Sequence, residues 1–169
     1  MTLIFPVFVL FVFGILEFGI NWNHRIQTAH AAREVARSAS VARMGDDSSC
    51  ATPGIASPPL LLHQTICLAK RKSGMDYADV RVKLIYMGPG GRRASDIANT
   101  KNSVMVCLMS RASSATLLLS PIFDGKFFNM KSVTKTAKPF GGLPVAEGEE
   151  TPLTGASWSF CVADEAGFE

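Results

Sequence analysis

Basic residues are missing from the start of this chain. No lysine or arginine precedes Arg25, although the chain holds 17 of them and has a net charge of +3. A secretory signal peptide begins with a basic region, continues with about 7–15 apolar residues and ends at a small-residue cleavage site. The apolar run over residues 1–20 is longer than that, and no Ala-x-Ala site ends it. These absences argue against a cleaved signal peptide.

The apolar run is long enough to cross a membrane. Its interruptions are Thr2, Pro6, Gly14, Glu17 and Gly19. As a helix rising about 1.5 Å per residue it would span roughly 30 Å, the thickness of a bilayer's hydrocarbon core. Residues 21–44 continue without glycine or proline but are polar and alanine-rich. We therefore expect one helix over residues 1–44, bent near Pro6 and ended at Gly45, with a membrane half and a soluble half.

The cysteines indicate an oxidising compartment. Cys50, Cys67, Cys107 and Cys161 are even in number and show neither C-x-x-C nor zinc-finger spacing. We therefore expect no metal site and two disulfides, with reduced core thiols as the alternative. The expected strands favour Cys107–Cys161, which leaves Cys50–Cys67. The positive-inside rule asks for basic residues on the cytoplasmic flank, so either a basic leader has been removed or the C-terminal domain is cytoplasmic; the cysteines favour the first.

The remaining residues, 45–169, predict one small domain. A helix is expected from Pro59 to Lys70, and residues 141–154 are expected to form a loop. Alternating apolar residues predict four strands, at residues 80–86, 104–109, 132–138 and 158–163. We predict an α+β, pilin-like fold: a long bent helix (residues 1–44) and a disulfide-stapled domain (residues 45–169) with a small antiparallel sheet.

Catalytic groupings are lacking. His24 and His30 fall on different helix faces, and His63 is isolated. The segment Gly88-Pro89-Gly90-Gly91 lacks the Lys-Ser/Thr pair of a phosphate-binding loop. The basic cluster Lys70-Arg71-Lys72 has no accompanying aromatic residues, so a solvated face is favoured over a nucleic-acid site. We expect no enzyme activity, cofactor, metal or small-molecule substrate, and no nucleic-acid partner.

Two features of the long helix suggest packing. An ionisable group within an apolar run is costly, so Glu17 should either snorkel to the outer interface or pair with a neighbouring subunit. The partner there could be Asn21, or the amine of Met1 in the adjacent copy. A seam of alanines at steps of three and four suits close helix packing, on the chain's own domain or between subunits. Its members are Ala29, Ala32, Ala36 and Ala39.

Three segments carry a family resemblance: Ile4-Phe5-Pro6, Phe13-Gly-Ile-Leu-Glu-Phe-Gly19 and Ala31-Ala-Arg-Glu-Val-Ala-Arg37. Together they resemble the TadE-like pseudopilins of tight-adherence pilus systems, although the short basic leader and early glutamate of that family are absent. The resemblance implies a minor pilin that is cut by a prepilin peptidase and inserted in the bacterial inner membrane. It would then join copies of itself, a major pilin or other minor pilins in an extracellular filament that supports adhesion.

The candidate assembly residues are Met1, Pro6, Gly14, Glu17, Phe18, Gly19, Ala29, Ala32, Ala36 and Ala39. Within the same class, the chain could instead be the major filament subunit. From another class, it could be a single-pass anchored extracytoplasmic binding or adhesin module outside any filament.

Overall fold

The fold is α+β, as expected. The computed structural model describes residues 4–42, 49–89, 92–94, 96–97, 99, 101–111, 126–135 and 144–161. Its helices are α1 (Ile4–Ser40) and α2 (Leu60–Ser73), and its strands are β1 (Val80–Met87), β2 (Ser103–Arg111), β3 (Phe127–Lys135) and β4 (Gly148–Glu149). Two short 3-10 helices are η1 (Tyr77–Asp79) and η2 (Trp158–Phe160). The predictions made at Met1, Gly45, residues 136–138 and residues 162–163 lie outside the described residues.

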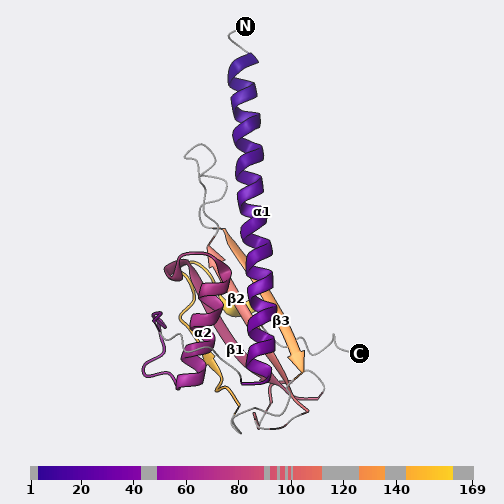
Figure 1. Ribbon diagram of the computed structural model, residues 1–169, viewed down its shortest axis with the longest axis vertical. Coiled ribbons are helices and arrows are strands. Elements are labelled where there is room, and N and C mark those ends of the chain that lie inside the picture. Colours follow the sequence, from indigo (N-terminus) through magenta and orange to yellow (C-terminus); the bar gives the residue numbers. More distant parts are fainter. Residues whose placement is uncertain are drawn as a thin grey trace.

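Helix α1 is unbroken over 37 residues, which confirms the single-helix prediction. It ends at Ser40, before the predicted end near Met44, because Ala42 takes a left-handed conformation (φ 50°). Its N-terminal half projects away from the rest of the molecule (Figure 1). Along its described length the ribbon shows no sharp kink, so the expected bend at Pro6 is not seen. The reason is position: Pro6 is the third residue of α1. In the first turn an amide has no acceptor within the helix, so proline removes no hydrogen bond.

Helix α2 runs one turn further than expected. It ends at Ser73, where Gly74 takes a left-handed conformation (φ 66°) and donates its amide to the carbonyl of Arg71. Glycine suits this position because it has no Cβ. Pro59 precedes the helix rather than lying in its first turn, and its carbonyl accepts the amide of His63.

The four strands form one antiparallel sheet in the order β3-β2-β1-β4. In the central pair, Val80 lies opposite Ser110 and Met87 opposite Ser103. Strand β4, which pairs with Lys83 and Leu84, falls within residues 141–154, where the sequence predicted only a loop. Because side chains alternate along a strand, the sheet has two distinct faces.

Both helices pack on one face of this sheet (Figure 1). Val35 and Ala36 of α1, Ile66 of α2 and Val82 and Val106 of the strands all belong to the same buried cluster. The cluster joins residues from both sides of the predicted division at residue 44. The predicted division into residues 1–44 and 45–169 thus describes the order of the sequence, while residues from both segments form one hydrophobic core.

The C-terminal segment covers the opposite face. Leu153, Trp158 and Cys161 pack there on Met105 and Met109. The prediction of a strand at residues 158–163 is wrong, because Trp158–Phe160 form a 3-10 turn on this face. The disulfide to Cys107 consequently joins the sheet to its covering segment rather than two neighbouring strands.

Candidate functional site

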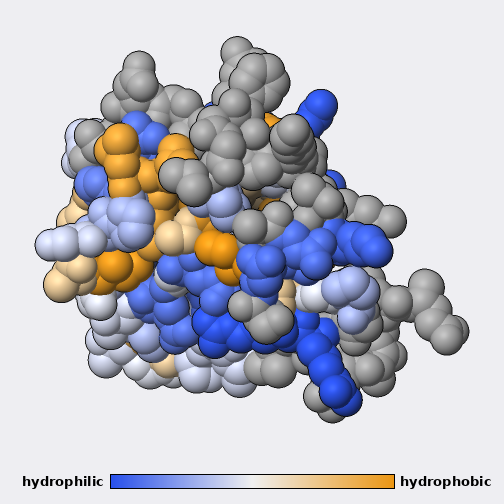
Figure 2. All heavy atoms as spheres, turned by 90° about the horizontal axis from the view of Figure 1, so that it is seen from below, coloured by the Kyte–Doolittle hydropathy of each residue, from blue (hydrophilic) through white to orange (hydrophobic). Residues whose placement is uncertain are grey.

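The N-terminal half of α1 presents apolar side chains to its surroundings. Its exposed large hydrophobic residues include Ile4, Phe5, Val7, Phe8, Leu10, Phe11, Val12, Phe13, Ile15, Leu16, Phe18 and Ile20. By length and composition, α1 can cross a membrane. The opposite end of the molecule differs: its described surface has hydrophilic side chains across the middle and a smaller hydrophobic area at one side (Figure 2). An exposed apolar surface of this extent marks a place where lipid or protein binds.

Five of the described candidate assembly residues lie on this projecting half: Pro6, Gly14, Glu17, Phe18 and Gly19. Pro6, Phe18 and Gly19 are exposed, and Gly14 is half-buried. A Cβ added at Gly14 or Gly19 would meet no atom within 4 Å, so the chain's own packing does not require glycine there. Gly14 lies in an apolar groove of about 430 Å³ along the helix. The other residues that line this groove are Val7, Leu10, Phe11, Ile15 and Phe18. Small residues flanked by large ones allow a second helix to approach closely.

Glu17 is the exception on this half, because its exposure is 0%. Asn21, one turn on, is also buried and donates from Nδ2 to the backbone carbonyl of Glu17 at 3.0 Å. The snorkelling interpretation therefore does not describe this structure, since the carboxylate does not reach solvent. The chain itself buries Glu17, and a partner in a neighbouring subunit stays a prediction.

The alanine seam packs on the chain's own domain. Ala32, Ala36 and Ala39 are buried in the cluster shared with α2 and the sheet, while Ala29 is half-buried. Ala31 and Val35 extend the same buried stripe. In this conformation the three buried alanines cannot touch a second subunit, so of the seam only Ala29 keeps surface for one.

A group at the end of the apolar half was missed by the sequence prediction. The rings of Phe18 and Trp22 stack with centroids 5.9 Å apart and planes 20° apart. The guanidinium carbon of Arg25 lies 5.9 Å from the centre of the Trp22 ring. Trp22 is 52% exposed. The i, i+4, i+7 spacing of these three residues was the signal that could have identified the group.

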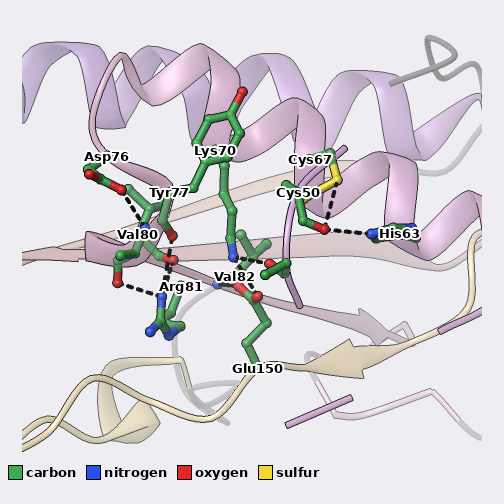
Figure 3. A network of polar contacts seen from close by, with 12 residues as sticks. Cys50, His63, Cys67, Lys70, Asp76, Tyr77, Val80, Arg81, Val82 and Glu150 are labelled. Carbon is green, nitrogen blue, oxygen red and sulfur yellow. Dashed lines mark hydrogen bonds and ion pairs between the residues drawn. A yellow bond between two sulfur atoms is a disulfide. The ribbon is translucent and has the colours of Figure 1, made fainter. Parts of the chain in front are cut away.

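A buried ion pair joins α2 to the sheet edge (Figure 3). Lys70 Nζ lies 2.7 Å from Glu150 Oε1 and also donates to the carbonyl of Ala51 at 2.7 Å. The second oxygen of Glu150 accepts the amide of Val82, and its backbone carbonyl accepts the indole N–H of Trp158. Burial raises the pKa of Glu150 and lowers the pKa of Lys70, while the contact between them opposes both shifts.

Both predicted disulfides are confirmed. The sulfur atoms of Cys50 and Cys67 are 2.04 Å apart, and those of Cys107 and Cys161 are 2.00 Å apart. His63 lies beside the first bond, with Nε2 2.9 Å from the carbonyl of Cys50. Cys50, His63 and Cys67 have their potential ligand atoms within 4.8 Å of one another. Because both sulfurs are joined in the disulfide, they are not available as thiolate ligands.

The comparison with known families agrees with the resemblance in the sequence. Residues 1–37 match the family model described as TadE-like protein. No curated protein and no solved structure matched the chain. The match thus covers the projecting half of α1 and most of the half that packs on the domain, and it ends before the first disulfide.

Proposed function

We propose that this chain is a pilin-like structural subunit of a Tad pilus, assembled through the N-terminal half of α1. The observation that carries the proposal is that the two halves of one continuous helix have different surroundings. Residues 4–20 are apolar and exposed apart from Glu17 and two half-buried positions, while the following turns are packed into the domain. A helix of this kind can be held by lipid and later by other helices without refolding the domain.

In this proposal the chain has two environments. It is first inserted in the bacterial cell membrane, where a prepilin peptidase and the assembly machinery act on it. It then enters an extracellular filament that supports surface adhesion, beside copies of itself, a major pilin or other minor pilins. The role is structural rather than enzymatic, and it needs no cofactor or small-molecule substrate. The match of residues 1–37 to the TadE-like model supports this class of partner.

The experiment is to purify surface filaments, image them and identify their subunits by mass spectrometry. Incorporation of the chain is the expected result. Filaments that form without it, while the chain remains folded in the membrane fraction, would refute the proposal. That outcome would favour a single-pass anchored binding or adhesin module.

A variant tests whether the exposed groove mediates assembly. Gly14→Ile fills the apolar groove without touching the domain, since no atom beyond the neighbouring backbone of α1 lies within 4 Å of the added Cβ. It is expected to lower incorporation while membrane insertion and both disulfides are retained. Val12→Ile is the matched control, because Val12 is exposed on the same half but outside the groove. Equal incorporation of the two variants would exclude the groove as a subunit contact.

A further inference from the structure

We propose that Trp22 and Arg25 bind the outer headgroup layer of the bilayer and thereby set the depth at which α1 is inserted. The inference rests on the membrane stage of the proposed function and names the residues that contact lipid there. The partner is a phospholipid interface, recognised by an aromatic ring with one polar edge and by a neighbouring cation.

The chemistry of the group fits this boundary. Tryptophan is enriched where a membrane meets water, because its ring is apolar and its N–H is polar. Trp22 is half exposed, stacks on Phe18 towards the apolar end and has Arg25 on the other side. Within the described part of the chain, Arg25 forms no ion pair, so its planar guanidinium is available for a lipid phosphate.

The length of the helix agrees with this depth. Ile4 and Trp22 both lie in α1, and the helix rises about 27 Å between them at ~1.5 Å per residue. The hydrocarbon core of a bilayer is about 30 Å thick. With Trp22 at the outer boundary, the exposed apolar residues from Ile4 to Ile20 therefore fall within the hydrocarbon.

The same depth places Glu17, which is 0% exposed, within the hydrocarbon. Five residues before Trp22, the backbone of Glu17 would lie about 7.5 Å inside the hydrocarbon. A carboxylate exposed to lipid there would be costly, but the side chain is covered by its own chain. At this level of α1, Glu17 and Asn21 are buried on one side of the helix, while Phe18 and Trp22 are exposed on another.

Tryptophan quenching by brominated lipids tests the depth directly. The full-length protein is placed in vesicles of phosphatidylcholine and phosphatidylglycerol with bromine near the headgroup, midway or deep in the acyl chains. The Trp22→Phe variant leaves Trp158, which is buried in the domain, as the background signal. The difference between the two proteins reports Trp22. Strongest quenching by the shallow bromines is expected; strongest quenching by the deep bromines, or none, would overturn the proposal.

Two probe variants calibrate the profile in the Trp22→Phe background. Leu16→Trp and Ile26→Trp use positions that are 54% and 41% exposed, so neither should disturb packing. Leu16→Trp is expected to be quenched most strongly by bromines that lie deeper than those that quench Trp22. Ile26→Trp is expected to show the weakest quenching of the three positions. The same depth for all three positions would show that α1 lies along the surface, contrary to the proposal.

Arg25 is tested by the choice of lipid headgroup. Quenching of Trp22 by brominated phosphatidylglycerol should exceed that by brominated phosphatidylcholine, and Arg25→Gln should remove the excess. Arg37→Gln is the matched control, since Arg37 lies about 22 Å beyond Trp22 along the helix. An excess that survives Arg25→Gln would refute the phosphate contact. Normal filament incorporation together with a failed depth profile would overturn this inference while the proposed function stands.

Discussion

Breaking the Lys70–Glu150 pair should destabilise the domain strongly. The perturbation is Lys70→Met, which keeps an apolar stem of similar length but removes the ammonium. Glu150 would then remain buried and, among the described residues, would keep the Val82 amide as the single donor to its side chain, while the carbonyl of Ala51 would lose a donor. Removing one partner of a buried pair costs about 3–5 kcal/mol, because the other charge stays uncompensated. We expect a loss of that size in the free energy of unfolding.

The loss should depend on pH in one direction. Burial raises the pKa of Glu150 above its ordinary 4.5 even with Lys70 present, so the folded state favours the protonated carboxyl. A group with a raised pKa stabilises the folded state below its unfolded pKa, and that contribution is lost as pH rises through the folded value. Without Lys70, only the Val82 amide and the charge of Arg81 still oppose this rise in the pKa of Glu150. The difference in unfolding free energy between the Lys70→Met variant and the native protein should therefore grow as pH rises above the ordinary Glu value of 4.5.

The assay is chemical unfolding of the full chain in detergent micelles, followed by Trp158 fluorescence in a Trp22→Phe background. The double variant Lys70→Met/Glu150→Gln is the control, because it removes the buried charge together with its partner. It should recover most of the stability lost in the single variant. A loss below about 1 kcal/mol, or one that is independent of pH, would refute the idea that the pair is a buried charge contact.

Three further predictions concern packing and titration. Gly148→Ala would drive a Cβ into the side chain of Leu62, so the melting temperature should fall; an unchanged value would show that Leu62 or β4 can shift to make room. Burial and the nearby Glu147 carboxylate raise the pKa of Tyr86 to about 12. The absorbance of the phenolate should show this titration at high pH. About 3 kcal/mol of unfolding free energy that is present below pH 10 should be lost between about pH 10 and 12. The Tyr86→Phe variant should not show this loss. Ala36→Leu overpacks the α1 seam and should cost about 1–3 kcal/mol in thermal unfolding. Ala29→Leu, at a half-buried position, should cost less.

The sequence was sufficient where one pattern dominates a segment. The continuity of α1 follows from the absence of glycine and proline after Gly19, and the first two strands follow from their alternation. The third strand was predicted at residues 132–138, but β3 begins five residues earlier, at Phe127. Both disulfide pairings also followed from the sequence, although the reasoning for Cys107–Cys161 assumed two neighbouring strands. Trp158 alternates with Phe160 as in a strand, yet its indole donates to the Glu150 carbonyl within a turn. Alternation alone cannot distinguish a strand from a turn that covers one.

The sequence was insufficient where contacts join distant segments. Strand β4 has two residues, which are too few to show an alternating pattern of apolar and polar residues. It forms where Gly148 fits between β1 and Leu62. Lys70 was predicted to lie on a solvated face with Arg71 and Lys72, but it is buried. Its position in the helix could have predicted this burial, since Lys70 follows the buried Ile66 by one turn and so lies on the same face of α2. Its partner, 80 residues away, could not be identified from spacing.

The burial of the alanine seam limits how subunits can meet. Since Ala32, Ala36 and Ala39 pack on the domain, the soluble half of α1 has only its other face for a neighbour. That face carries Arg33 and Arg37, whose charges are poorly suited to a dry interface between identical copies. In the proposed filament, apolar contact between subunits is therefore concentrated on the projecting half of α1. There lipid is the alternative environment, so assembly must be driven by close helix packing rather than by withdrawal of apolar surface from water.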